Sequence, residues 1–435
     1  MDWARADAEV VEIAATLIGI DTTNPGDGTG PGERAAAEYV VSLLAEVGVA
    51  ADIVGPTPDR TSVLARIHGH DRHRPGLAVH GHLDVVPAHA PDWQVPPFSG
   101  AVVDGILWGR GAVDMKGQVA MILAVIRAHI RAGITCPRDL VLAFFADEEA
   151  GMVHGSRWVT EHHPEHFAGV TEAIGEVGGF SHSLSGGQRL YLIATAEKGI
   201  SWLRLIAQGR AGHGAMLNDE NAVLRLAAAV DRVGRAEFPI RVHPSVMSLL
   251  SAVAEVSGTD FDPADLGPTV ALLGSLAPMV GASLRNTAQP TGLTAGYKVN
   301  VVPGQAYAEV DGRYLPGERT EFLARIDELL GEHVRREFIC DDIAVESPVA
   351  AGIVTSMVEA IGAVDPQARV VPYLLSGGTD NKALSRLGIH GYGFLPLRLP
   401  AELDFLRMFH AVDERVPVAS LQFGMRALER FLRIA

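Results

Sequence analysis

A short apolar run that ends in His82 and Asp84 constrains the fold of this chain more than any other segment. The run Leu77-Ala-Val-His80 is typical of a buried strand in a parallel sheet, and Gly81 interrupts it. In an open α/β sheet, ligands bind just beyond the carboxyl ends of the strands. A histidine there, with a carboxylate two residues later, can bind a metal while the acid orients the imidazole. An exposed histidine and aspartate at an ordinary strand end explain this segment alone equally well.

Acidic residues follow two further predicted strands. The apolar run 139–146 leads into Asp147-Glu148-Glu149, and the run 172–177 ends at Glu176. Adjacent acids at the mouth of a buried strand repel one another unless a cation neutralises them, although a solvated loop is the alternative. Asp114 stands between them, just before a long apolar helix predicted at 118–132. Because strand ends meet at one edge of a sheet, we expect these side chains to share a site with His82.

Composition and charge narrow the classes of protein. With 435 residues, 48% of them hydrophobic, the chain is long enough for two globular domains. The net charge of −16 argues against a nucleic-acid partner, which needs a basic surface.

The two cysteines, Cys136 and Cys340, exclude a disulfide scaffold and a cysteine-based zinc finger, and they suit a reducing cytosol. The N-terminal residues lack the apolar core of a signal peptide, and no run approaches the roughly 18 apolar residues of a membrane span. The longest apolar contender, 119–126, is interpreted as a buried helix. We therefore expect a cytoplasmic protein with no membrane partner.

The pattern of helices and strands changes after Ala196. We expect helices at 221–233 and 320–334, and strands at 199–207, 270–273, 293–301, 306–313 and 343–346. This alternation resembles a split βαβ sandwich, interrupted by a helical insertion near 245–256. The predicted fold class is α/β with an inserted α+β domain. The predicted boundaries are 1–196 for the first part of the main domain, 197–347 for the inserted domain and 348–435 for the second part.

Two short motifs point to other sites and are rejected. Gly109-Arg-Gly111 opens a helix as in dinucleotide-binding folds, but the third glycine is missing and Asp114 would repel a pyrophosphate. His162-His-Pro-Glu-His166 has the spacing of an inverted zincin motif. Pro164 interrupts the helical face that such a site needs, so we interpret this segment as a helix-to-loop turn.

Seven motifs occur in order along the chain. They are Gly-His82-x-Asp84, Gly-Arg-Gly-x-x-Asp114-x-Lys-Gly, Asp-Glu148-Glu149-x-Gly, Glu176-x-Gly-Gly, Gly-x-x-Gly-His213-Gly, Ser-Gly-Gly-Thr-Asp380 and His410-x-x-Asp-Glu-Arg. Together they resemble the metallopeptidase family of aminoacylase, carboxypeptidase G, carboxypeptidase S and succinyl-diaminopimelate desuccinylase, over nearly the whole chain. The resemblance implies a zinc-exopeptidase-like catalytic domain that carries an inserted, ferredoxin-like lid or dimerisation domain.

The resemblance also implies a set of metal ligands. Asp114 would bridge two zinc ions, one held also by His82 and Glu176, the other by Glu149 and His410. Imidazole and carboxylate ligands without thiolates suit zinc, with cobalt and manganese as alternatives. Two such ions can share one water molecule and lower its pKa.

Catalytic and substrate-binding roles follow from the same resemblance. Glu148 would be the general base that activates the shared water, and Asp84 would orient His82. His213 would reach the substrate carbonyl, in several relatives from the partner subunit of a homodimer, and cis and trans action stay open here. The residues that align with substrate-binding positions are Asn286, Arg313, Gly377, Gly378 and Thr379.

We therefore expect a zinc-dependent amide hydrolase that cleaves an N-acyl amino acid or a short peptide beside a free carboxylate. Glu197-Lys-Gly-Ile-Ser-Trp looks most like the aminoacylase and carboxypeptidase S branch. A dipeptidase, or a deacylase of a biosynthetic intermediate, is the alternative with the same chemistry. The alternative without hydrolytic activity is a catalytically silent metal-binding assembly protein. The presence of Glu148 argues against this alternative, because a structural metal site needs no free base.

Overall fold

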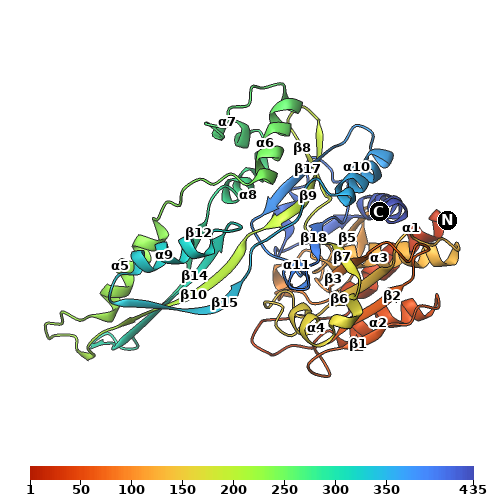
Figure 1. Ribbon diagram of the computed structural model, residues 1–435. Helices are drawn as coiled ribbons and strands as arrows, with labels where there is room; N and C mark the ends of the chain where they lie inside the picture. Colours follow the sequence, from red (N-terminus) through yellow and green to blue (C-terminus); the bar gives the residue numbers. More distant parts are fainter.

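The larger of two principal sheets organises most of the molecule (Figure 1). The computed structural model describes residues 1–435. The strands of this sheet are β1 (Asp52–Val54), β2 (Ser62–Ile67), β3 (Gly76–His82), β6 (Leu140–Phe145), β7 (Val170–Gly175), β8 (Ser181–Ser183), β9 (Arg189–Glu197), β16 (Val345–Glu346), β17 (Arg369–Leu375) and β18 (His390–Gly393). Their order is β1-β2-β6-β3-β7-β18-β9-β16, with β8 and β17 also paired to β9. The β6–β3, β3–β7 and β7–β18 pairs are parallel, so the carboxyl ends of these strands share one edge.

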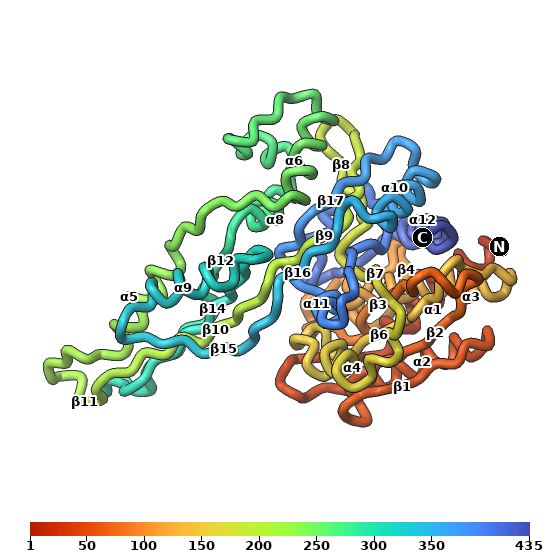
Figure 2. The backbone as a smooth tube through the Cα atoms, viewed as in Figure 1, coloured from red at the N-terminus to blue at the C-terminus, as the bar shows by residue number.

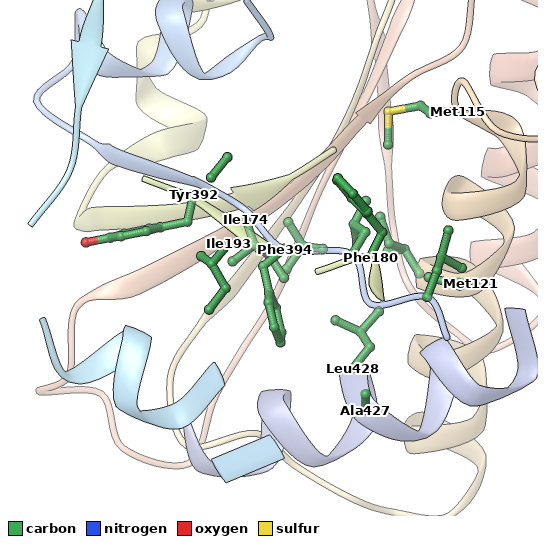
Figure 3. Close-up of a cluster of buried hydrophobic side chains, with 14 of the residues drawn as sticks. Met115, Met121, Ile174, Phe180, Ile193, Tyr392, Phe394, Ala427 and Leu428 are labelled. Carbon is green, nitrogen blue, oxygen red and sulfur yellow. The ribbon is translucent and has the colours of Figure 1, made fainter. Parts of the chain in front are cut away.

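Helices cover both faces of this sheet because its strands are apolar on both sides. They are α1 (Trp3–Gly19), α2 (Arg34–Ala45), α3 (Lys116–Arg131), α4 (Ser156–His162), α10 (Gly352–Val364), α11 (Asn381–Ser385) and α12 (Val418–Ile434). In β2, Val63 packs into the core under α1, α2 and α3, whereas its neighbour Leu64 packs towards α4 and α11. Figure 3 shows part of the core that contains Val63. There Phe394, just after β18, packs together with Phe180 and with Leu428 of α12. The expected buried helix at 119–126 is confirmed within α3.

The smaller sheet is a separate unit, called here the smaller domain. It contains β10 (Gly199–Gln208), β12 (Thr287–Ala295), β14 (Gln305–Tyr314) and β15 (Val334–Asp342), all antiparallel in the order β12-β14-β10-β15. Helices α5 (Ala222–Gly234) and α9 (Arg319–Leu330) pack on one face and enclose its own apolar core. The connectivity β10-α5-β12-β14-α9-β15 is that of a split βαβ unit. Its function as a lid stays a prediction.

Three helices inserted into the smaller domain pack on the larger core instead. They are α6 (Pro244–Ser257), α7 (Gly267–Ala271) and α8 (Ala277–Ala282). Val246, Leu249 and Val280 belong to the larger apolar cluster, and α6 lies against β17. The expected helical insertion is confirmed, but the strand predicted at 270–273 is wrong. A four-residue apolar run fits a buried helix turn as well as a strand, and here Pro268 starts a helix.

Two other predicted elements of the smaller domain differ from the structure. The helix expected to reach residue 334 ends at Leu330, where Gly331 adopts a φ of 70°. The following segment is the charged strand β15, which the sequence pattern does not reveal because Arg335, Arg336 and Glu337 break the apolar alternation. The strand expected at 293–301 is two strands, since β12 ends at Ala295 and β13 (Val301–Val302) pairs with β11 (Gly212–His213).

The remaining elements are short. A three-stranded sheet contains β4 (Val102–Val103), β5 (Ile106–Trp108) and β19 (Arg415–Pro417), and the 3-10 turns are η1 (Ala90–Asp92), η2 (Pro164–Phe167), η3 (Gly274–Leu276) and η4 (Phe405–Met408). None of the helices combines the length and the apolar character that crossing a bilayer requires. The domain boundaries at 196/197 and 347/348 stay predictions.

Candidate active site

The shared edge of β6, β3 and β7 carries the acids and the histidine singled out in the sequence. His82 is the last residue of β3, Glu148 and Glu149 follow β6, and Glu176 follows β7 directly. β3 pairs in parallel with β6 on one side and β7 on the other, which brings the three strand ends together.

Two clusters of potential ligands meet at Asp114. In the first, Nε2 of His82 lies 3.0 Å from Oδ1 of Asp114 and 3.6 Å from Oε2 of Glu176. In the second, Nε2 of His410 lies 3.2 Å from Oδ2 of Asp114 and 2.9 Å from Oε2 of Glu149. Each oxygen of the Asp114 carboxylate therefore faces a different cluster. This is the arrangement that a carboxylate bridging two cations requires.

The burial of several carboxylates close together is the observation that tests whether cations fit here. Burial raises the pKa of Glu176 to about 8 and that of Glu149 to about 7, with the Asp114 charge adding to both. Oε1 of Glu149 is buried and has no hydrogen-bond partner. Carboxylates and imidazoles at these distances form a hard, oxygen- and nitrogen-rich donor set, so the residues fit a pair of divalent cations.

Asp84 holds the turn that carries Glu148 and Glu149. Its carboxylate accepts the backbone N–H of Glu148 and of Glu149, each at 3.1 Å. Nδ1 of His82 lies 3.0 Å from the backbone oxygen of Asp84 and 3.5 Å from its carboxylate. Asn24 donates to both Asp84 and Asp147, at 2.9 and 3.0 Å. Asp84 therefore contacts the imidazole, as expected, and also holds the turn after β6, a contact that the sequence pattern does not reveal.

Glu414 holds the loop that presents Asp114. Its buried carboxylate accepts the backbone N–H groups of Gly111, Val113 and Asp114 at 2.7–3.1 Å, and Arg110 donates to it at 2.7 Å. The sequence motif His410-x-x-Asp-Glu-Arg contains Glu414, yet nothing in the spacing indicates its contact with a loop some 300 positions earlier.

A pocket of about 350 Å³ opens beside the two clusters. The carboxylate of Glu148 lines it but belongs to neither cluster. Burial and the neighbouring charge of Glu176 raise the pKa of Glu148 well above its ordinary value. The apolar residues that line the pocket, called here the apolar wall, are Val177, Met279, Leu375, Leu406 and Phe409. The pocket therefore offers both an acid suited to proton transfer and apolar side chains suited to an apolar group.

The glycine-rich turn after β17 also lines this pocket. Gly377 and Gly378 face it, and their backbone N–H groups donate to no protein acceptor. Thr379 lies beneath the turn, where its N–H and hydroxyl donate to the buried carboxylate of Glu197 at 3.0 and 2.6 Å. The two glycines are available to a ligand, whereas both donors of Thr379 are engaged within the protein.

Three other predicted residues do not line this pocket. His213 is exposed on β11, at the end of the smaller domain that lies away from the larger sheet (Figure 2). The side-chain oxygen of Asn286 accepts the N–H of Leu315 at 2.8 Å. Arg313 pairs with Asp311 at 2.6 Å and stacks over the Trp202 ring. Within one chain, therefore, the pocket is built without these residues.

The rejected zincin-like segment is confirmed as a helix-to-loop turn. α4 ends at His162, and Pro164 opens the separate turn η2, so His162 and His166 do not share one helical face. The side chains of His163, Glu165 and His166 nevertheless gather close enough to hold a cation, so the absence of a metal there stays a prediction. A larger cavity, of about 910 Å³, lies beside α12 but is lined by no acid or histidine. Cavity size therefore does not mark the reactive site.

Comparison with known proteins agrees with the fold and with this site. Residues 78–434 match the family model described as Peptidase family M20/M25/M40. The chain belongs to this peptidase family. The resemblance drawn from the seven motifs is confirmed, and the protein is a hydrolase that acts on amide or peptide bonds.

Other M20 proteins share both sequence and architecture with the chain. The human N-fatty-acyl-amino acid synthase/hydrolase PM20D1 is 27% identical over 415 residues, which are 92% of this chain and 82% of the relative. The M20 metallo-carboxypeptidase Sso-CP2 of Sulfolobus solfataricus superimposes with a TM-score of 0.75 at 18% identity, covering 98% of this chain and 99% of the other. The Bacillus subtilis YXEP protein, described as a dinuclear metal-binding M20 peptidase, gives 0.63 at 14% identity, with 99% and 98% covered. The predicted α/β fold class is confirmed.

Proposed function

We propose that the protein is a two-zinc hydrolase of N-acyl amino acids, with Glu148 as its general base. The observation that carries the proposal is the bridging position of Asp114 between two clusters, beside an acid that belongs to neither. His82 and Glu176 would hold one ion, and Glu149 and His410 the other. Zinc bound there would supply Lewis acidity for the scissile carbonyl and would lower the pKa of a water molecule, with cobalt or manganese as substitutes.

Glu148 performs the proton transfers. The N–H of Glu148 is held by Asp84, and Glu148 lines the pocket without joining a cluster. It takes a proton from the attacking water and passes it to the leaving nitrogen, which must be protonated before the amide bond can break. Glu149, in contrast, is engaged with His410 and serves as a ligand.

The free carboxylate of the substrate binds at the glycine-rich turn. The unengaged N–H groups of Gly377 and Gly378 form an anion-accepting concavity of the kind that backbone amides provide. Thr379 supports this turn through Glu197. The side chains of three further residues are engaged with other protein groups: Asn286, Arg313 and Thr379. Their contacts with the substrate stay predictions.

The acyl group of the substrate lies along the apolar wall. Met279, Leu406 and Phe409 would contact an aliphatic chain, whereas the charged amino terminus of a dipeptide would lose hydration there without gaining a partner. The relative named for N-fatty-acyl-amino acids agrees with this preference. We therefore favour N-acyl amino acids over dipeptides as substrates.

Shortening Met279 tests this preference. Met279→Ala should lower kcat/KM for a long-chain N-acyl amino acid by about 10-fold and leave the N-acetyl compound nearly unchanged, because only the longer chain reaches the wall. The comparison is made by assaying N-acyl amino acids of increasing chain length and matched dipeptides with added zinc, cobalt or manganese. Val153→Ala, an exposed apolar side chain outside the pocket, is the control. A uniform loss across all chain lengths would contradict the assignment of the wall to the acyl group.

His213 and the smaller domain point to a homodimer. His213 is exposed at the end of this domain, together with the apolar side chains of Met216, Leu217, Tyr297 and Val299. We propose that this end covers the pocket of a second copy and that His213 stabilises the oxyanion there.

The cytoplasmic location remains our prediction and rests on the two free cysteines, Cys136 and Cys340.

Mixing two inactive variants tests action in trans. His213→Ala should reduce kcat by about 10²–10³-fold with metal content unchanged, because one oxyanion donor is lost. Glu148→Gln supplies an intact His213, so a refolded mixture of the two variants should regain activity. The readout is turnover of the mixture against each variant alone. Absence of any gain, in a mixture shown to form mixed dimers, would contradict action in trans.

A further inference from the structure

Lysine is rare in this chain, and two of its buried lysines lie at the junction of the two sheets. Only four lysines occur, among 36 basic residues. Lys116, Lys198 and Lys382 are completely buried, and Lys298 is exposed on the smaller domain. Lysine is almost never fully buried unless its ammonium group is fully partnered, so buried lysines at one junction call for a physical reason.

Lys198 lies where β9 passes into β10, which is one crossing of the chain from the larger sheet to the smaller domain. Its ammonium group donates to the carbonyl oxygens of Ala282 and Arg285, at 3.1 and 2.8 Å, and to the hydroxyl of Thr287 at 3.2 Å. These acceptors lie at the end of α8 and the start of β12, which is a second crossing. Lys198 therefore ties two crossings together and uses all three of its N–H donors.

Lys382, in α11, ties the first crossing to a third. Its ammonium group donates to the carbonyl oxygen of Lys198 at 2.6 Å and to that of Ile343 at 2.7 Å. Ile343 lies between β15 and β16, where the chain returns from the smaller domain (Figure 2). The carboxylate of Glu197, which also holds Thr379, lies 3.7 Å away.

Both lysines also touch elements that line the pocket. A side chain at Gly378 would bring a Cβ atom to 2.2 Å from Cε of Lys382, so the glycine-rich turn rests directly on this lysine. Met279, in the apolar wall, belongs to α8, whose last residue Ala282 accepts the hydrogen bond from Lys198. The junction and the two pocket walls are therefore connected by the same two side chains.

We propose that Lys198 and Lys382 are positioning residues that couple the orientation of the smaller domain to the shape of the pocket. A compact ammonium group can meet converging carbonyl oxygens from several directions, which a planar guanidinium cannot. Rotation of the smaller domain must move the crossings, and the lysines transmit that displacement to Gly378 and to α8. Neither lysine touches the two clusters of potential metal ligands.

Amide hydrogen exchange of the full-length protein tests this coupling directly. Lys382→Met should speed exchange about 10-fold or more in 197–200 and 342–345, because the carbonyl groups of two crossings lose their shared donor. Lys198→Met should do the same in 282–288. Arg127→Met is the matched control, because Arg127 is a buried cation that also donates to a carbonyl oxygen and an acid, but far from the junction. Faster exchange across the whole molecule, or none at the crossings, would overturn the proposal.

Gly378→Ala tests the same contact from the pocket side, and keeps the test decisive if a lysine variant does not fold. The added Cβ must displace Cε of Lys382, so exchange in 197–200 and 342–345 should rise although the substitution lies outside both segments. Unchanged exchange there would overturn the coupling.

A second arm rests on the proposed function: Lys198→Met should change the kcat/KM ratio between long-chain and N-acetyl substrates by about 3-fold or more, with KM affected more than kcat. The exchange arm does not depend on the substrate, so its failure would be distinguishable from failure of the proposed function.

Discussion

Glu148→Gln is expected to reduce turnover of an N-acyl amino acid by about 10²–10⁴-fold while the metal content stays unchanged. Glutamine preserves the size of the side chain and leaves the backbone N–H bonded to Asp84, but it cannot accept a proton. Because Glu148 belongs to neither cluster, its loss should not release a cation. A large loss of kcat with normal metal content would separate a proton-transfer function from a ligand function.

Elemental analysis and steady-state kinetics on the same preparation provide the measurement. Glu172→Gln is a suitable control, since Glu172 lies near the opposite end of β7 and pairs with Arg138. Loss of metal from Glu148→Gln would mean that Glu148 is a ligand. Retention of full activity would exclude Glu148 as the general base.

The second large effect is expected for Asp114→Ala, which should remove both cations from the protein. The two oxygens of Asp114 face His82 and His410 separately, so no other single side chain serves both clusters. Glu176 belongs to one cluster only, so Glu176→Gln should weaken the binding of only the cation that His82 also holds. The expected result is near-complete loss of bound metal for Asp114→Ala and partial loss for Glu176→Gln.

Metal titration monitored by calorimetry distinguishes these outcomes. Asp365→Asn controls for the loss of a buried carboxylate, because Asp365 is buried and pairs with Arg189 away from the pocket. If Asp114→Ala bound one cation as tightly as the unmodified protein, the bridging assignment would be wrong. The thermal unfolding transition of each metal-free variant is also measured, to check that the variant is folded.

Local sequence patterns predicted much of the larger domain and the chemical character of its site. Strand β6 and helix α3 agree closely with the expected ranges, because continuous apolar runs and long helical periodicity are strong signals. The smaller domain was less predictable. β15 is charged on its exposed face, and the run at 270–273 was too short to distinguish a strand from a helix turn.

The sequence by itself determined that His82, Glu148, Glu149 and Glu176 lie together, because residues at the ends of parallel strands share one edge of a sheet. His410 joined this set only through the family resemblance. Only the tertiary structure decided how those side chains are held. Asp84, Glu414 and Lys382 act through hydrogen bonds to backbone groups far away in the chain. A backbone N–H donor or carbonyl acceptor has no residue identity that a motif could record. Such contacts become visible only once packing has brought the segments together.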